Sequence, residues 1–136
     1  MTSQEKLFKP VKSIDADETK TLIAGKAEGA YTLLDVRQPV EYESEHIPGA
    51  KLIPLPDLKD GHRRLDLQKP VIVYCRSGGR SLAAAQFLSG LGFNEIYNLE
   101  GGIMGWQGSR AAGPRVLNLE LVRGDETPAE MIALAY

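Results

Sequence analysis

The stretch VIVYCRSGGRSLAAAQFL, residues 71–88, decides the fold of this chain of 136 residues. Its first half is an apolar, β-branched run that ends in Cys75, the single cysteine of the chain. Such a run is typical of a central strand in a parallel sheet, where both faces are buried, and it predicts a strand over 70–75. A glycine-rich turn follows, and an alanine-rich segment then predicts a helix that starts near Ser81. The stretch is therefore a strand–loop–helix unit.

Leucine and alanine recur at helical spacing in the second half of this stretch and just beyond it. The residues expected to form the buried face of the helix are Leu82, Ala85, Leu88 and Leu91. Gly90 and Gly92 are expected to close this helix.

Other parts of the chain repeat the alternation of strands and helices. A capping box from Asp15 to Glu18 predicts a short helix that ends at Gly25. The segment 101–106 predicts a short helix or turn. Three more apolar runs predict strands at 31–36, 50–55 and 95–99. This order indicates an α/β fold with a mostly parallel sheet.

Composition excludes several classes of function. Hydrophobic residues make up 43% of the chain, charged residues 25%, and the net charge is −2, so no nucleic-acid or membrane partner is expected. One cysteine cannot form an internal disulfide or a cysteine-rich metal site, and His46 and His62 lack metal-ligand spacing, so we expect no metal and no cofactor. The first ten residues, MTSQEKLFKP, contain no apolar segment, which favours a cytoplasmic location where a thiol stays reduced.

Cys75 is the candidate nucleophile because of the residues around it. Ligands of parallel sheets gather at the carboxyl ends of strands, where Cys75 lies. Glycines in the loop let successive N–H groups converge on one point, and the helix N-terminus adds partial positive charge. The loop itself is Arg76, Ser77, Gly78, Gly79 and Arg80. No Asp or Glu occurs between Pro70 and Asn94 to cancel its charge.

Each of these features stabilises a thiolate relative to a thiol. Lowering the pKa of Cys75 by about two units requires roughly 2.7 kcal/mol, of which a helix end supplies about 0.3–1 kcal/mol. Backbone hydrogen bonds and the arginines must supply the rest. The alternative is a small buried hydrophobic side chain at a strand end, which leaves the glycine pair and both arginines unexplained.

Three ordered motifs resemble those of the rhodanese-type sulfurtransferases, in particular the single-domain type. CRSGGRS (75–81) resembles the active-site loop of that family, whose pattern is C-x-x-G-x-R. LLDVRQPVEYESEHIPGAKLIPL (33–55) is similar to its upstream signature, and NLEGGIMGW (98–106) to its closing motif. The resemblance covers residues 8–108, which we interpret as one rhodanese-like domain.

The resemblance implies an α/β fold of about five mostly parallel strands with helices on both faces. It also implies a thiosulfate sulfurtransferase: the Cys75 thiolate takes a sulfane sulfur from thiosulfate or a persulfide, holds it as a persulfide, and passes it to a thiol or cyanide. By position, the N–H groups of residues 76–80 would cradle the terminal sulfur. Arg80 would orient the loop, and Arg76 would attract the anionic donor.

The same resemblance assigns supporting roles to residues outside the loop. Arg37 is expected to join the substrate-binding residues, and Asp35, Glu41 and Ser81 to support the site structurally. Asp35 and Arg37 are expected to brace it by ion pairing with Glu41 as a partner; the alternative for Glu41 is a surface salt bridge of little energetic value.

Four side chains near these motifs have simpler expected roles. His46 is expected to hydrogen-bond the turn that follows it rather than to act as a general base. His62 is expected to be solvated. Trp106 and Met104 are expected to pack rather than to function.

Loop length separates sulfur transfer from a related chemistry. Cell-cycle phosphatases and arsenate reductases of similar pattern place five residues between cysteine and arginine, whereas four intervene here. A shorter ring of N–H groups suits one sulfur atom better than a tetrahedral phosphate. The loop therefore favours sulfur transfer.

A second class of function stays open, a non-catalytic rhodanese-like interaction or redox-sensing module within a larger protein. Degenerate members of the family usually lose the cysteine, whereas this chain keeps it with both arginines. Because the chain has no resolving cysteine, an enzyme would need a separate thiol or protein as sulfur acceptor.

Residues 109–136 are expected to form a C-terminal extension. Segment 107–115 predicts a linker, and segment 116–122 predicts a short extra strand. Thr127 is expected to cap a helix of about two turns that ends at Tyr136. Either this helix docks on the same domain, or a longer natural protein continues into a helical domain. DETPAEMIALAY (125–136) is weakly similar to the entry of ferritin-like, rubrerythrin-type domains. An exposed patch on this tail would favour a homodimer.

Overall fold

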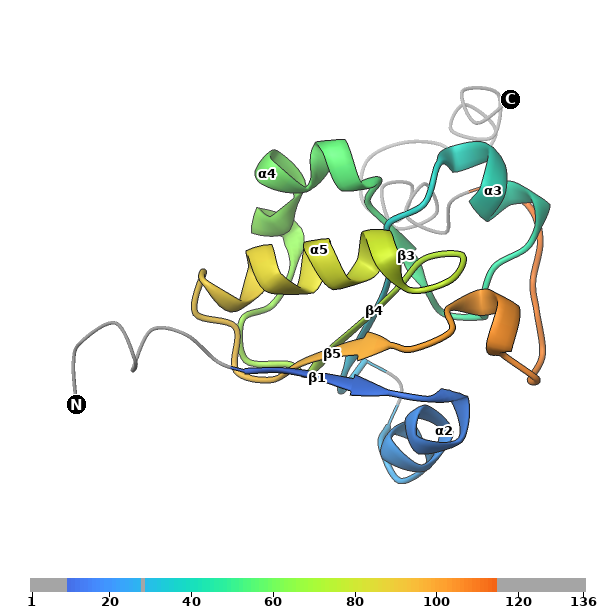
Figure 1. The fold of residues 1–136 in the computed structure, drawn as a ribbon, viewed down its shortest axis with the longest axis horizontal. Helices are drawn as coiled ribbons and strands as arrows, with labels where there is room; N and C mark the ends of the chain where they lie inside the picture. Colours follow the sequence, from blue (N-terminus) through green and yellow to red (C-terminus); the bar gives the residue numbers. More distant parts are fainter. Residues whose placement is uncertain (1–9, 28, 115–136) are drawn as a thin grey trace, which may run out of the picture.

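A computed structural model describes residues 10–27 and 29–114 of the chain. Five strands form one sheet in the order β1-β5-β4-β2-β3, and all four pairings are parallel (Figure 1). The strands are β1 (Val11–Ile14), β2 (Thr32–Asp35), β3 (Lys51–Leu52), β4 (Val71–Tyr74) and β5 (Ile96–Leu99). The predicted parallel α/β sheet of five strands is confirmed.

Strand β4 lies at the centre of the sheet and carries the cysteine loop at its carboxyl end. All four of its residues are buried, as the apolar run predicts. It pairs with β2 on one side and β5 on the other, with Val71 aligned to both Thr32 and Ile96. Loops that follow β2, β4 and β5 therefore meet at one edge of the sheet.

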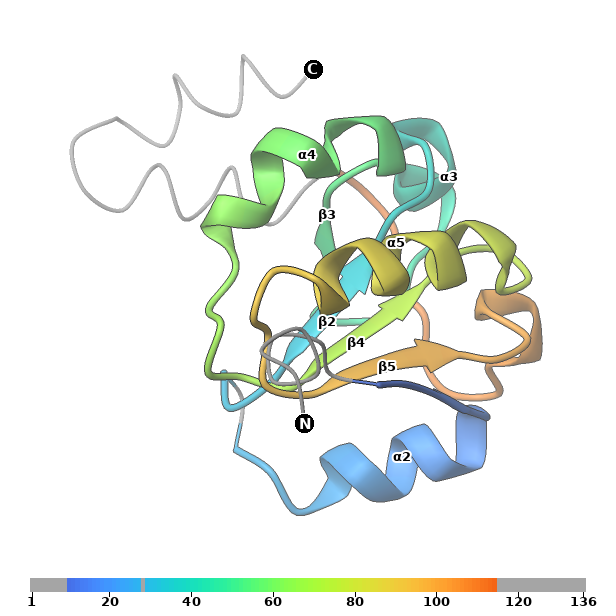
Figure 2. The same cartoon turned by 60° about the vertical axis from the view of Figure 1, so that its left-hand side comes forward.

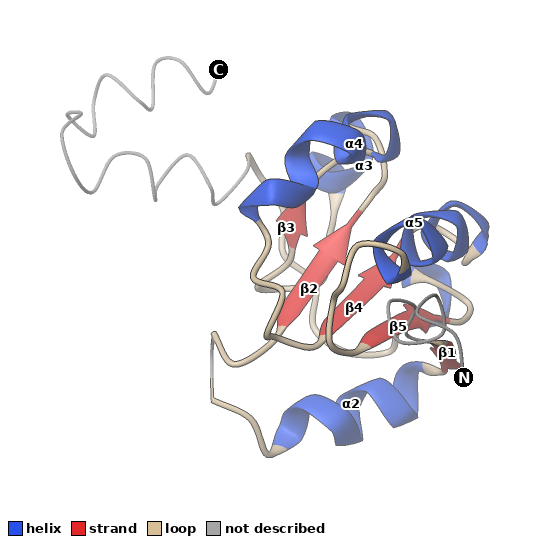
Figure 3. Ribbon diagram, turned by 90° about the vertical axis from the view of Figure 1, so that its left-hand side faces the viewer, coloured by secondary structure: helices blue, strands red, loops and turns tan. Residues whose placement is uncertain are grey.

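Helices cover both faces of the sheet, as the resemblance implied. Figure 3 shows α2 on one side, with α4 and α5 on the other. The α-helices are α2 (Ala16–Ala24), α3 (Pro39–Ser44), α4 (Leu58–Gly61) and α5 (Gly79–Ser89). Three 3-10 turns accompany them, η1 (Leu55–Asp57), η2 (His62–Arg64) and η3 (Ile103–Gly105). Alternate residues of β4 enter two apolar clusters, one against α5 and one against α2 and η3.

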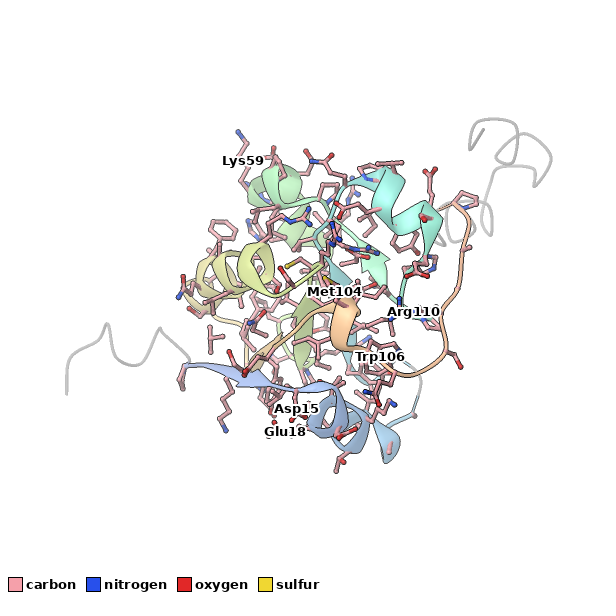
Figure 4. All side chains as sticks on the ribbon, turned by 45° about the vertical axis from the view of Figure 1, so that its right-hand side comes forward. Asp15, Glu18, Lys59, Met104, Trp106 and Arg110 are labelled. Atoms are coloured by element: carbon pink, nitrogen blue, oxygen red, sulfur yellow. The ribbon has the colours of Figure 1, made fainter. Side chains whose placement is uncertain are left out.

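The capping box that predicts the first helix is confirmed. The Glu18 N–H donates to Asp15 Oδ1 at 2.8 Å, and the Asp15 N–H donates to Glu18 Oε1 at 3.1 Å. Figure 4 shows both side chains together at the start of α2. Gly25 is the C-terminal cap, as expected.

Helix α5 begins two residues before the predicted start and turns a different face to the core. Gly79 and Arg80 are its first two residues. Its buried residues are Ser81, Ala84, Ala85, Leu88 and Ser89. The expectation that Leu82 and Leu91 are buried is wrong, because both side chains are more than a third exposed.

Several elements have no counterpart among the expected ones, namely β1, α3, α4 and the turns η1 and η2, and one strand is shorter than expected. Strand β1 joins the sheet edge beside β5, and α3 follows the loop after β2 (Figure 2). The predicted strand 50–55 is regular over only two residues before the prolines turn the chain.

The segment after residue 106 folds back onto the domain as far as Gly113. Ala111 and His46 form an antiparallel bridge with two hydrogen bonds of 2.8 Å, and the Gly113 N–H donates to Glu43 O at 2.9 Å. The first part of the predicted linker is therefore hydrogen-bonded to the domain, and both the linker and the domain boundary stay predictions. The expected strand 116–122 and the helix after Thr127 lie outside the described residues. Within residues 10–27 and 29–114, no helix has the length and apolarity needed to cross a membrane.

Candidate active site

Cys75 follows the last residue of β4 and is only 1% exposed. Its sulfur nevertheless lies among hydrogen-bond donors. The Gly78 N–H donates to Sγ at 3.1 Å and the Ser81 N–H at 3.3 Å, while Ser81 Oγ lies 3.4 Å away. The backbone of the loop thus curls around the sulfur, as the sequence predicts.

Two opposing effects act on the pKa of Cys75. Burial is the largest and raises it, because the charged form loses water. Hydrogen bonds from the Ser81 side chain and from the N–H groups of Ser81, Gly78 and Ser77 lower it. Together these bonds outweigh burial, so the pKa of Cys75 lies below its ordinary value. A thiolate is the nucleophilic form of cysteine, so this environment suits attack on sulfur.

The two loop glycines have different conformational roles. Gly78 has φ of +114°, a backbone conformation that side chains rarely adopt, and it is the N-cap of α5. Gly79 has no positive φ, and apart from its chain neighbours and the backbone of its own helix no atom lies within 4 Å of where its Cβ would be. The turn that brings the Gly78 N–H to the sulfur therefore depends on Gly78.

The closing motif supports the loop from the side of β5. The Ile103 N–H donates to Cys75 O at 3.0 Å, and the Met104 N–H donates to Arg76 O at 3.1 Å. A Cβ on Gly102 would lie 2.4 Å from Arg76 O, so only glycine allows this approach. The expected short helix or turn at 101–106 is η3, and it fixes the backbone on which the cysteine sits.

Arg80 and Glu41 connect the loop to α3. The two Arg80 end nitrogens lie 2.8 and 3.1 Å from the two carboxylate oxygens of Glu41. The hydrogen bond from Arg80 is the main reason that the pKa of Glu41 falls to about 2. Glu41 was expected beside Asp35 and Arg37, and this expectation is corrected to Arg80. The expectation that no acidic residue cancels the positive charge of the loop is also wrong for Arg80, because Glu41 of α3 is its counterion.

Asp35 and Arg37 form a buried pair at the end of β2. Arg37 Nε and one end nitrogen donate to Asp35 at 2.8–3.1 Å, and that end nitrogen also donates to Glu45 O at 2.7 Å. Burial alone would lower the pKa of Arg37, but Asp35 raises it above its ordinary value. The expected ion pair is present. Arg37 is 4% exposed, and its Nε and this end nitrogen donate to protein atoms. Its predicted role in substrate binding therefore stays a prediction.

A pocket of about 310 Å³ lies beside the cysteine loop, between α3 and η3. Arg76 lines it and is exposed, and within the described ranges no carboxylate pairs with it. The pocket is completed by Arg37, Glu41, Ser44, Glu45, Ile103, Met104 and Arg110. Arg110 is held by Glu45 and by the carbonyls of Ile103 and Trp106. Arg76 is thus the loop cation that remains open to an anion.

The four side chains with simpler expected roles differ in how far the structure agrees with them. Trp106 packs as expected, but Met104 is 63% exposed at the pocket. His46 is buried, stacks on Tyr42, and its Nδ1 lies 2.7 Å from Tyr42 O, which is a carbonyl of α3 rather than of the following turn. His62 is half-buried against Phe87 rather than fully solvated.

Asn98 is a neighbour of the site that the sequence did not identify. It lies on β5, is 4% exposed, and its Oδ1 is 2.6 Å from Ser81 Oγ. The amide side chain of Asn98 inside the run EIYNL was the available signal, because an amide in a buried strand needs a partner.

Comparison with protein families and curated proteins gives one consistent result. The model of the Rhodanese-like domain matches residues 15–109. A thiosulfate sulfurtransferase, GlpE of Pseudomonas syringae, is 40% identical over 75 residues, which are 55% of this chain and 71% of that protein. YqhL of Bacillus subtilis, which carries no assigned function in its name, is 49% identical over 76 residues, or 56% of this chain. This chain covers 60% of the length of YqhL.

Solved structures agree with the sequence comparison. A rhodanese-related protein from Thermoplasma volcanium superposes with a TM-score of 0.65 at 36% identity, covering 74% of this chain and 97% of that one. A rhodanese with anions from E. coli gives 0.55 at 32% identity, covering 62% of this chain and all of the other. The family match at residues 15–109 spans strands β2 to β5 and the cysteine loop described above.

Proposed function

Because the chain belongs to the rhodanese-like domain family, whose model matches residues 15–109, we propose that it transfers sulfane sulfur through a persulfide on Cys75. The observation that carries the proposal is the pair of N–H groups, from Gly78 and Ser81, that donate to a buried sulfur. The name of the GlpE relative, a thiosulfate sulfurtransferase, supports the same reaction class.

In the first half-reaction the Cys75 thiolate attacks the outer sulfur of thiosulfate. The S–S bond of thiosulfate breaks, sulfite departs with its electron pair, and Cys75 carries a terminal persulfide sulfur with the negative charge. Arg76 is placed to attract the dianionic donor, because it is exposed at the pocket beside the loop. The N–H groups of the loop stabilise the charge on sulfur before and after the transfer.

In the second half-reaction a nucleophile removes the terminal sulfur. Cyanide would leave as thiocyanate and a thiolate would leave as a persulfide, and in both cases the electron pair of the broken bond returns to Cys75. The chain has one cysteine, so a thiol acceptor comes from another molecule. The physiological donor and acceptor, the homodimer and the cytoplasmic location stay predictions.

The test compares the wild type with Cys75→Ser in an assay of thiocyanate formation from thiosulfate and cyanide. We expect turnover in the wild type and none in the variant, because serine cannot form a persulfide. Thiocyanate formation that survives in Cys75→Ser would contradict the proposal. A wild type that forms no thiocyanate and takes up no sulfur would favour the interaction or redox-sensing module instead.

A further inference from the structure

Two buried polar side chains, Ser81 and Asn98, lie behind the sulfur of Cys75 and form a hydrogen-bonded series with it. Ser81 Oγ is 3.4 Å from the sulfur and 2.6 Å from Asn98 Oδ1. Asn98 is aligned with Val73 of β4, and with Ile96 it faces α5, which carries Ser81. Neither Ser81 nor Asn98 is open to solvent, so they must satisfy each other and the cysteine.

The positions of the protons in the hydrogen bonds between Cys75, Ser81 and Asn98 depend on the ionisation of Cys75. The Ser81 hydroxyl has one proton and three neighbours that can accept it: Asn98 Oδ1, Gly78 O at 3.1 Å, and the sulfur. When Cys75 is a neutral thiol, its S–H can donate to Ser81 Oγ, while the hydroxyl donates to Asn98 Oδ1. When Cys75 is a thiolate, the sulfur has no proton to give and instead needs one from Ser81.

A carboxamide is suited to both states. After a half-turn about its last side-chain bond, Asn98 presents Nδ2–H to Ser81 instead of Oδ1, so Ser81 Oγ accepts from Asn98 and its proton is free for the sulfur. A carboxylate of the same shape can only accept, and it would hold the hydroxyl proton away from the sulfur.

We propose that Asn98 is a positioning residue: through Ser81 it directs a hydroxyl proton toward the sulfur when Cys75 is ionised and away from it when Cys75 is neutral. The proposal rests on the proposed role of Cys75 as nucleophile. It assigns Asn98 no contact with substrate, since Ser81 lies between Asn98 and the sulfur.

Asn98→Asp adds one carboxylate to the charged groups that already surround Cys75, and the Ser81→Ala background separates its direct effect on the sulfur from its effect through Ser81. The loop of Cys75 contributes Arg76 and Arg80, α3 contributes Glu41 on Arg80, and the end of β2 contributes the Asp35–Arg37 pair. Strand β5 contributes the polar side chain of Asn98, which contacts Ser81.

The experiment titrates Cys75 by the ultraviolet absorbance of its thiolate. With one cysteine in the chain, the signal is unambiguous once the Cys75→Ser spectrum is subtracted. Asn98→Asp is expected to raise the apparent pKa of Cys75 by about one unit, which is a tenfold change in the thiolate-to-thiol ratio. In a Ser81→Ala background the same substitution should raise it by less than half as much, because the intermediary is missing.

Asn98→Leu gives a second, uncharged comparison of similar size. With the amide removed, the Ser81 hydroxyl is left with Gly78 O and the sulfur as acceptors, so the pKa of Cys75 should stay at or below the wild-type value. Circular dichroism establishes that each variant is folded. Three results would overturn the proposal. The pKa of Cys75 rises equally in Asn98→Asp with and without Ser81, it does not rise in folded Asn98→Asp, or it rises in Asn98→Leu as much as in Asn98→Asp. The titration needs no sulfur transfer, so failure of the proposed function would not change its reading.

Discussion

Cys75 combines two properties that usually belong to different kinds of cysteine. It lies among Val73, Ala84 and Ala85, as an inert core thiol would. Yet its sulfur accepts two backbone N–H groups, and these bonds with Ser81 keep its pKa below the ordinary value in spite of burial. A buried hydrophobic side chain has no use for such donors, so the surroundings indicate a stabilised thiolate.

Gly78 and Gly79 give a matched test of the loop. Gly78→Ala places a side chain at φ of +114° and should destabilise the protein by about 1–3 kcal/mol. Gly79→Ala meets no atom within 4 Å at a helical position and should change the free energy of unfolding by less than about 1 kcal/mol, in either direction. Urea unfolding of both variants measures the difference. Equal losses in the two variants would show that the left-handed turn is not what the loop requires.

At the scale of elements, α3 and α5 are joined through the Glu41–Arg80 pair. Glu41→Gln keeps the shape and an oxygen near Arg80 but removes the charge, so we expect a loss of about 0.5–1 kcal/mol at neutral pH for a pair this exposed. The pKa of Glu41 is about 2 in the folded protein and about 4.3 in an unfolded chain. Its contribution is therefore complete above about pH 4.3 and disappears as the pH falls toward about 2.

Urea unfolding at a series of pH values measures this contribution. The difference between wild type and Glu41→Gln should shrink as the pH falls through that window. Glu43→Gln, an exposed carboxylate on the same helix, is the control and should change stability by less than about 0.5 kcal/mol. A difference for Glu41→Gln that stays constant from neutral to acid pH would contradict the assigned ion pair.

The face of α5 is tested by two leucines on the same helix. Leu88 is fully buried, so Leu88→Ala should cost about 2–5 kcal/mol through lost burial and a cavity. Leu82 is 37% exposed, and Leu82→Ala should cost less than about 0.5 kcal/mol. Thermal or urea unfolding measures the two losses of stability. A larger loss for Leu82→Ala than for Leu88→Ala would contradict the observed buried face and favour the one predicted from helical spacing.

For the whole molecule, the sequence predicts the sheet well where strands are buried on both faces. The run at 70–75 is apolar throughout and becomes β4, and the capping box at Asp15 becomes the start of α2. Strand β1 escapes prediction because two of its four residues, Lys12 and Ser13, are exposed at the edge of the sheet. Helix α3 has six residues, too few for a periodic apolar face to emerge.

In the site as well, the sequence predicts features that depend on neighbouring residues but not contacts between residues far apart in the chain. Loop curvature around Cys75 follows from glycines close in sequence, and the sequence predicts it. The contacts of Arg80 with Glu41 and of Ser81 with Asn98 span 39 and 17 residues, and only the sheet order brings these partners together. The face of α5 also depends on the sheet, because Leu82 and Leu88 have the same apolarity and differ only in what covers them.

The most direct test of the account is the mass of the intact protein after incubation with thiosulfate. We predict an increase by one sulfur atom on the wild type, removed by cyanide, and no increase on Cys75→Ser. An unchanged wild-type mass, or an added sulfur that Cys75→Ser also acquires, would contradict the claim that Cys75 is held as a thiolate ready to accept sulfur.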